Sequence, residues 1–286
     1  MKIIDGKLIA SEIKQELKQE VLRLKDQGIV PGLGIILVGN NDASEIYVRN
    51  KMKVCEELGI QAYLYRFDES NQEEEIVAKI LELNQDINID GVLVQCPLPT
   101  CFNEERILAA VDSNKDVDGF GVYHLGALLS NHEEIIAATP LGILKMLEHE
   151  HIEVRGKHVV MVGASIIVGR PMATVLLNRG ATVSVLHRDT LNLKELTRQA
   201  DILIVAIGNA KFITDEYVKD GAVVIDVGTN YVDGKLYGDV DFETVSRKAS
   251  YITPVPGGVG PMTIVCLLSN LVDQAKKRRN IDGSKN

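Results

Sequence analysis

The chain has 286 residues, of which 45% are hydrophobic and 25% charged, and its formal net charge is −9. This length suits about two domains, and the composition is that of a globular protein, not of a disordered or low-complexity one. The acidic balance provides no positive field to attract nucleic acid or an anionic membrane, so we expect neither as a partner. Because no signal-peptide pattern and no apolar run of membrane-spanning length occurs, we expect a cytoplasmic protein.

Cysteine and histidine spacing does not suggest a metal site. The four cysteines are scattered without a C-x-x-C pair, which predicts reduced thiols. His149 and His151 flank Glu150, and on a helix two residues at this spacing point to different sides. The sequence therefore predicts no bound metal.

The first half of the chain alternates helical and strand patterns. In chain order the expected elements are a helix from Ser11 to Gln27, a strand from Leu33 to Val38, a helix from Ser44 to Leu58, a strand from Gln61 to Phe67, a helix from Gln72 to Gln85, and a strand from Asp90 to Gln95. The last strand stops at Pro97 and Pro99, which cannot continue a buried ladder. Such alternation predicts a parallel sheet covered by helices.

The second half repeats the alternation and predicts a Rossmann-like domain. The expected elements are a helix from Pro140 to His149, a strand from Lys157 to Val162, a loop from Gly163 to Gly169, a helix from Arg170 to Arg179, a strand from Thr182 to Leu186, a helix from Leu191 to Gln199, strands from Ile202 to Ala206 and from Val223 to Val227, and a helix from Met262 to Lys277. The polar tail from Arg278 to Asn286 is expected to fray.

The loop from Gly163 to Gly169 is a candidate phosphate-binding loop. It follows an apolar strand and precedes a helix with Pro171 in its first turn, so backbone N–H groups could face a phosphate at the helix N-terminus. Its sequence pattern, G-x-S-x-x-x-G, departs from the dinucleotide-binding pattern G-x-G-x-x-G. The alternative to a phosphate-binding loop is a plain strand-to-helix turn. The flanking strands and helices favour dinucleotide binding.

The residues after the second strand of this domain bear on the choice of cofactor. A carboxylate normally stands there in NAD-binding domains, yet Leu186 is followed by His187 and Arg188. A guanidinium suits the 2′-phosphate of NADP. The alternative is a solvated surface arginine partly neutralised by Asp189.

Three features of the first half could carry chemistry. Tyr47 and Lys51 lie one helical turn apart, so a phenol and an amine share one helix face. In short-chain dehydrogenases this pair follows the glycine loop, whereas here it precedes the loop, which disfavours that family. Gln95 ends a strand where an amide could orient an amine, and Asp118 lies in an acidic turn suited to binding a ring with N–H donors. Taken singly, an amphipathic helix and a turn-forming aspartate explain them equally well.

Seven motifs in one order identify the family that the chain resembles. They are Tyr47-x-x-x-Lys51, VQCPLP, NKDVDGF, TPLG, GASIIVGRPM, DVGTN and TPVPGGVGPMT. Over essentially its whole length, the chain resembles bifunctional methylenetetrahydrofolate dehydrogenase/methenyltetrahydrofolate cyclohydrolases. The resemblance implies an α/β fold with two α/β domains and a cleft between them, the second a Rossmann-like NADP-binding domain. It further implies a homodimer, domain limits at 1–138 (completed by the C-terminal helix, 262–286) and 139–261, and a place in one-carbon metabolism that serves purine, histidine and methionine biosynthesis.

The resemblance also assigns roles to residues. Lys51 would be the catalytic amine, oriented by Gln95, while Tyr47 would pack on the folate ring and Asp118 would bind the pterin. Further substrate contacts are expected from Pro97, Leu98, Pro256, Gly257, Gly258 and Thr263. Dinucleotide contacts are expected from Gly163, Ala164, Ser165, Arg188 and Thr229.

Four positions depart from the family pattern. Ala164 stands where many members have Arg, Cys96 where Leu is common, His124 where Asn is frequent, and Thr229 in place of Ile. Without the loop arginine, selectivity for NADP is expected to depend on Arg188.

Two alternatives to the bifunctional enzyme remain at this stage. Another NADP-linked two-domain dehydrogenase would explain the glycine loop but would leave Gln95 and the PGGVGPMT loop without a role. A non-catalytic dinucleotide sensor would not require both Tyr47 and Lys51.

Overall fold

The computed structural model describes residues 1–279, and the part of the expected C-terminal helix and tail at 280–286 lies outside this range. The chain divides into two compact units. Unit 1 contains Met1–Glu12 and Leu128–Cys266, and unit 2 contains Ile13–Ala127 and the chain from Leu267 onwards. All residues expected to form the dinucleotide-binding domain, 139–261, lie in unit 1, while the domain limits themselves stay a prediction.

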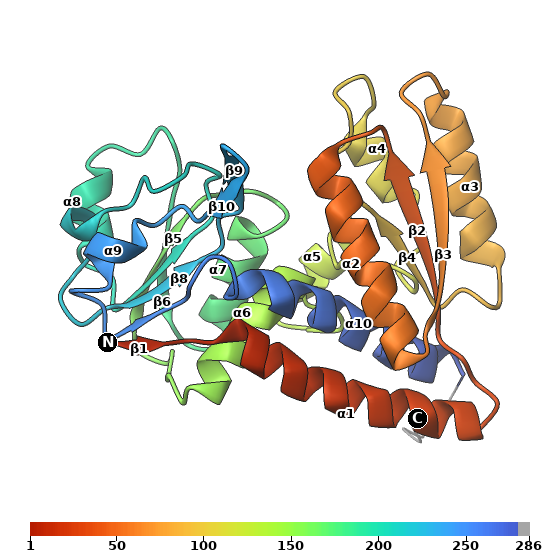
Figure 1. Cartoon of the computed structure of the whole chain (residues 1–286), viewed down its shortest axis with the longest axis horizontal. Helices are drawn as coiled ribbons and strands as arrows, with labels where there is room; N and C mark the ends of the chain where they lie inside the picture. The colour runs from red at the N-terminus through yellow and green to blue at the C-terminus, as the bar shows by residue number, and fades with distance from the viewer. Residues whose placement is uncertain (280–286) are drawn as a thin grey trace. The chain divides into compact units, whose positions relative to one another are not determined.

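Unit 2 is built around a three-stranded parallel sheet (Figure 1). The strand order is β3 (Gln61–Phe67), β2 (Gly32–Val38), β4 (Gly91–Val94). Every residue of β2 and β4 is buried, as expected for parallel strands covered on both faces, whereas β3 at the edge has no buried residue. The helices with residues in this unit are α1 (Gly6–Asp26), α2 (Asp42–Leu58), α3 (Glu73–Gln85), α4 (Glu104–Ala109), α5 (Val122–Leu129) and α10 (Val259–Arg278).

Helix α2 is delimited by clear signals in the sequence. The Asn41 side chain accepts a hydrogen bond from the backbone N–H of Ser44 at 3.1 Å, which caps the first turn. Gly59 ends the helix in the left-handed conformation, with φ of 77°. These signals set the two ends of the helix that carries Tyr47 and Lys51.

Unit 1 contains a six-stranded sheet in which all neighbouring strands are parallel. The order is β1 (Lys2–Ile3), β11 (Tyr251–Ile252), β8 (Val223–Asp226), β7 (Ile202–Val205), β5 (His158–Val162), β6 (Thr182–Leu186). A separate antiparallel hairpin joins β9 (Asn230–Val232) to β10 (Lys235–Tyr237). The remaining helices are α6 (Ala138–His149), α7 (Gly169–Asn178), α8 (Leu193–Thr197), α9 (Phe242–Val245) and the short 3₁₀ helix η1 (Asp215–Tyr217).

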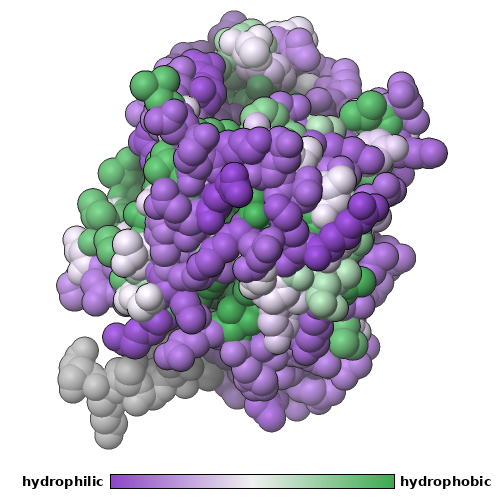
Figure 2. Space-filling view, turned by 90° about the vertical axis from the view of Figure 1, so that its left-hand side faces the viewer, coloured by the Kyte–Doolittle hydropathy of each residue, from purple (hydrophilic) through white to green (hydrophobic). Residues whose placement is uncertain are grey.

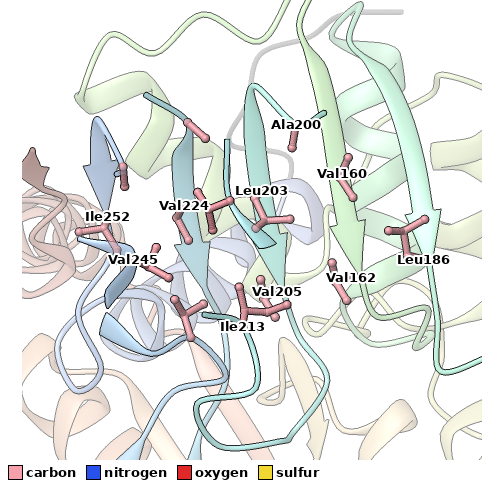
Figure 3. Packing of buried hydrophobic residues seen from close by; sticks show 14 residues of the cluster. Val160, Val162, Leu186, Ala200, Leu203, Val205, Ile213, Val224, Val245 and Ile252 are labelled. Atoms are coloured by element: carbon pink, nitrogen blue, oxygen red, sulfur yellow. The ribbon is translucent and has the colours of Figure 1, made fainter. Parts of the chain in front are cut away.

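A hydrophobic cluster of unit 1 combines branched aliphatic side chains of neighbouring strands with buried residues of the connecting segments and of α9 (Figure 3). Val160, Leu203 and Val224 come from β5, β7 and β8, and each is fully buried. By contrast, the face of the molecule that bears α8 and α9 is mostly hydrophilic, with smaller hydrophobic groups (Figure 2). From β5 the chain adds β6 on one side and then β7 on the other side. Open parallel sheets bind ligands at such a change of side.

The structure confirms the expected strands and long helices and corrects several limits. The helix expected from Leu191 to Gln199 is only α8, because Asn192 has φ of 55° and so cannot be helical. Helix α10 begins at Val259 and not at Met262, since Pro261 is tolerated in a first turn. Asp5 accepts hydrogen bonds at the start of α1, which therefore begins before Ser11.

Several short elements were not anticipated. Strands β1 and β11 have two residues each, too few to show a pattern. The hairpin β9–β10 turns at Asp233-Gly234, both with positive φ, and this dipeptide is a recognised hairpin signal that could have revealed it.

Replacing Leu203 by Ala should lower the free energy of unfolding by about 2 to 5 kcal/mol, because it leaves a cavity at a fully buried position of β7. Urea denaturation followed by circular dichroism measures the change. Leu177→Ala is the matched control, since Leu177 is 59% exposed and should change stability little. Equal stabilities of the two variants would contradict the packing described.

Candidate functional site

A buried lysine is the centre of the candidate site in unit 2. Lys51 lies on α2 and is only 6% exposed. Its Nζ donates a hydrogen bond to Oε1 of Gln95 at 2.9 Å. Burial lowers the pKa of Lys51 below its ordinary value, while the negative charge of Asp118 opposes the shift. A larger fraction of Lys51 is therefore in the neutral form, which can accept a proton, than in an ordinary lysine.

Gln95 holds the amine in a fixed direction. It is the residue immediately after β4 and is itself 9% exposed. Its Nε2 donates to the carbonyl oxygen of Cys96 at 2.7 Å, which orients the amide so that Oε1 faces Lys51. The predicted pairing of amide and amine is thus present, between the end of a strand and a helix.

Asp118 is the second titratable group near Lys51. It is half-buried, and burial raises its pKa to about 7, although the positive charge of Lys51 opposes this shift. The neighbouring carboxylate of Asp116 raises the pKa further. A carboxyl group and an amine with pKa values displaced toward each other are typical of sites that transfer protons or bind polar ligands.

The loop that carries Asp118 is held rigidly by its neighbours. Nζ of Lys115 donates to the carbonyls of Leu83 and Asp86, each at 2.7 Å, at the C-terminal end of α3. The carboxylate of Asp116 accepts from the backbone N–H groups of Gly119 and Gly121, each at 2.8 Å. Sequence reasoning placed function only on Asp118 in this motif and missed the buried Lys115 and Asp116, which shape the turn.

His124 also supports this loop. It is 2% exposed, and its Nε2 lies 2.8 Å from the carbonyl oxygen of Ser113. The buried Nδ1 has no hydrogen-bond partner within the described residues. The departure from the family pattern at this position therefore places a buried imidazole against Ser113, in the segment that leads to Asp118.

The other expected folate contacts in unit 2 differ in exposure. Tyr47 is half-buried one turn before Lys51 on α2. Pro97 is exposed, whereas Leu98 is 8% exposed and belongs to the hydrophobic cluster around α3 and β4. Contact of these residues with a substrate stays a prediction.

The glycine loop of unit 1 requires its glycines. A Cβ at Gly163, whose φ is 119°, would lie 2.2 Å from the carbonyl oxygen of Ala206. One at Gly169 would lie 2.1 Å from the carbonyl oxygen of Gly163. The hydroxyl of Ser165 accepts from the backbone N–H groups of Val168 and Gly169 at 3.2 and 3.4 Å, which closes the turn before α7. Both Cβ positions point into the protein's own backbone, so the two glycines are required for the loop to pack this tightly.

Two arginines lie near this loop. Arg188 follows β6, and the backbone N–H of Gly163 donates to the carbonyl of Leu186 at 2.8 Å, which brings the two segments together. The Arg188 side chain is 94% exposed, with only a 3.8 Å contact to Asp189, so it can turn to an anion. The guanidinium of Arg170 donates to the carbonyl of Ala164 at 3.1 Å. Sequence reasoning missed Arg170, although the Gly-Arg-Pro at the start of α7 is a visible signal.

The remaining expected contacts also belong to unit 1. Thr229 is exposed just beyond the end of β8. Pro256 is exposed, and Gly257 and Gly258 are buried before α10. The Thr263 hydroxyl lies 3.0 Å from that of Thr139.

The histidines at the end of α6 have structural partners. His149 contacts Glu12 and Glu150, each at 3.3 Å, while His151 lies beyond the helix with φ of 55°. Helix α6 ends at His149, as does the expected helix from Pro140 to His149, and it begins two residues earlier, at Ala138. Across residues 1–279, no three His, Cys, Asp or Glu side chains cluster to hold a metal ion. None of the helices in this range combines the length and apolar character needed to cross a bilayer.

Comparison with known proteins places both units in one family. The family models for the catalytic domain and for the NAD(P)-binding domain of tetrahydrofolate dehydrogenase/cyclohydrolase match residues 4–118 and 137–279. The bifunctional protein FolD of Halalkalibacterium halodurans is 51% identical over 275 residues, 96% of this chain and 99% of the relative.

Solved structures agree with this. The bifunctional FolD from Campylobacter jejuni has a TM-score of 0.95 and 50% identity, over 97% of this chain and 99% of its own. The Trypanosoma brucei enzyme, solved with NADP and an inhibitor, has a TM-score of 0.93 and 34% identity, over 97% and 98%. The two-domain α/β fold and the resemblance expected from the motifs are therefore confirmed. The chain belongs to the tetrahydrofolate dehydrogenase/cyclohydrolase family.

Proposed function

We propose that this protein catalyses two successive reactions on a one-carbon derivative of tetrahydrofolate. It oxidises 5,10-methylenetetrahydrofolate to the 5,10-methenyl cation with NADP, and it hydrolyses that cation to 10-formyltetrahydrofolate. The observation that carries this assignment is the buried Lys51 amine hydrogen-bonded to Gln95, in a chain about 50% identical to bifunctional relatives. Membership of this family favours the bifunctional enzyme over another NADP-linked dehydrogenase and over a non-catalytic sensor.

The hydrolysis needs a group that moves protons, and Lys51 supplies it. The oxygen of a water molecule bonds to the methenyl carbon and one of its protons is released. The bond from that carbon to N5 then breaks, and the remaining hydroxyl proton moves to N5. A neutral amine can accept and return these protons, and burial keeps a larger fraction of Lys51 neutral. Gln95 keeps the amine directed at the reacting carbon.

The oxidation depends mainly on positioning. When bound, the nicotinamide supplies the hydride acceptor. Asp118 binds the pterin ring and Tyr47 packs against it, so that the methylene carbon is held for transfer. Pro97 and Leu98 in unit 2, and Pro256, Gly257, Gly258 and Thr263 in unit 1, are assigned as further substrate contacts.

The residues of unit 1 fit a dinucleotide. Gly163 and Gly169 allow the loop to fold tightly on its own backbone at the N-terminus of a ten-residue helix, where backbone N–H groups can bind a phosphate. Together with Ala164, Ser165 and Thr229 they are assigned to the dinucleotide. Arg188 is assigned to the 2′-phosphate, because a guanidinium forms charge-assisted and bidentate bonds to phosphate.

We assign the enzyme to the cytoplasm as a homodimer that takes part in purine, histidine and methionine biosynthesis. Support for the dimer is the unpaired outer edge of β6, where Val185 is 40% exposed. The net charge of −9 supports the absence of nucleic acid and membrane partners.

Lys51→Met should reduce methenyltetrahydrofolate hydrolysis by at least about 100-fold, the usual contribution of a positioned acid or base. Dehydrogenase activity should survive in part, because the amine is not required for hydride transfer. The measurement is the fall in methenyl absorbance, with Lys53→Met, an exposed residue of the same helix, as control. Full hydrolytic turnover in a folded Lys51→Met protein would remove Lys51 from the mechanism.

Gln95→Glu should move the activity profile for hydrolysis to higher pH. A carboxylate at this position stabilises the ammonium form of Lys51 and so raises its pKa, which leaves less neutral amine at pH 7. Activity should fall at neutral pH and recover as the pH rises, measured as kcat/KM above the uncatalysed rate. An unshifted profile would show that Gln95 does not act on the amine.

Arg188→Ser should raise the KM for NADP by about tenfold or more, since a charged hydrogen bond contributes about 1.5 to 3 kcal/mol. The KM for NAD should change little. Arg247→Ser, an exposed arginine of the same unit, is the control. Equal use of NAD and NADP by the wild type, or unchanged NADP kinetics in Arg188→Ser, would refute the assignment.

A further inference from the structure

Two buried carboxylates in unit 1 have no role in the assignments above. Asp226 ends β8 and is 4% exposed, and Asp239 follows the β9–β10 hairpin and is fully buried. Within residues 1–279, neither forms an ion pair with a lysine, arginine or histidine. Burying a charge without a counterion is costly unless hydrogen bonds compensate, so the partners of the two groups must explain their presence.

Asp239 accepts several hydrogen bonds from the segment that follows β7. Its carboxylate accepts hydrogen bonds from the backbone N–H groups of Ile207 at 2.6 Å, Gly208 at 3.1 Å and Asn209 at 2.8 Å. It also accepts from Nδ2 of Asn230 at 2.9 Å. One side chain therefore binds three consecutive backbone groups of the loop after β7 and the first residue of β9.

Asp226 holds the loop after its own strand. Its carboxylate accepts from the backbone N–H groups of Gly228 at 2.9 Å, Asp239 at 2.9 Å and Val240 at 3.0 Å. Because one of these donors belongs to Asp239, the two aspartates form one connected network. Burial raises the pKa of Asp226 to about 7, and the backbone N–H groups oppose that shift.

The backbone is packed directly onto both carboxyl groups. A Cβ at Gly228 would lie 2.4 Å from the carboxyl carbon of Asp239, and a Cβ at Gly238 would lie 1.8 Å from Oδ2 of Asp226. Each site admits only glycine unless the backbone moves. The two loops are therefore packed tightly against both carboxyl groups.

These loops are continuous with the dinucleotide site. Ile207 follows Ala206, whose carbonyl oxygen lies against Gly163 so closely that a Cβ there would be 2.2 Å away. Thr229 lies between Gly228, bound to Asp226, and Asn230, bound to Asp239. All of these segments leave the carboxyl ends of β5, β7 and β8, the edge where parallel sheets bind ligands.

We propose that Asp239, together with Asp226, is a positioning residue for the dinucleotide, because the pair holds the backbone at 206–209 and 228–230 against the glycine loop and Thr229. The inference rests on the proposed use of NADP. Neither carboxylate needs to touch the cofactor. They act by presenting backbone groups and Thr229 in the geometry that binds it.

The test is Asp239→Asn, which keeps the size of the side chain but turns a nitrogen toward backbone N–H donors. The KM for NADP and the Kd for NADPH, the latter from its fluorescence, should rise by about tenfold or more, as expected for a loss of about 1.4 kcal/mol. The KM for methylenetetrahydrofolate and kcat at saturating NADP should change much less. A role only in stability would lower the melting temperature without this split.

Asp233→Asn is the matched control, since Asp233 is exposed at the tip of the same hairpin and should leave NADP kinetics unchanged. If Asp239→Asn does not fold, Asn230→Ala removes one donor and leaves both carboxylates, and its KM for NADP should still rise several-fold. Unchanged affinity in whichever variant folds would overturn the inference. A wild-type protein that binds no NADPH would overturn the proposed function and this inference together, whereas wild-type binding with unchanged variants overturns only the inference.

Discussion

Parallel pairing of fully buried strands is the constraint on which both units depend. Strands β2, β4, β7 and β8 are buried along their whole length, so their side chains, apart from Asp226 at the end of β8, are used for packing. Polar side chains occur where these strands end. Gln95 follows β4 and Asp226 ends β8, and in each unit the candidate site lies at that carboxyl edge.

The two units use this edge in different ways. Unit 2 places titratable side chains there. Burial lowers the pKa of Lys51 and raises that of Asp118, and so favours the neutral forms of both. Unit 1 relies on backbone shape, with glycines that allow tight packing and buried aspartates that accept hydrogen bonds from the loops. Proton transfer requires tuned acids and bases, whereas binding a dinucleotide requires close approach to backbone N–H groups.

Arg188 is an exposed residue whose position depends on the buried sheet. Its side chain is 94% exposed and weakly paired, so it contributes little to stability. Its position is nevertheless set by the end of β6, which is bonded through Leu186 to Gly163. The sheet therefore sets the position of this exposed cation relative to the glycine loop, while the side chain itself adds little to stability.

The sequence by itself determined the order of the main strands and long helices and the family, because periodicity and motif order are properties of the chain alone. It could not reveal that Lys115, Asp116, Asp226 and Asp239 are buried, nor that Gln95 turns its oxygen to Lys51. These facts depend on contacts between residues far apart in the chain. Burial and hydrogen-bond partners set the pKa of each group, and only the tertiary structure decides them.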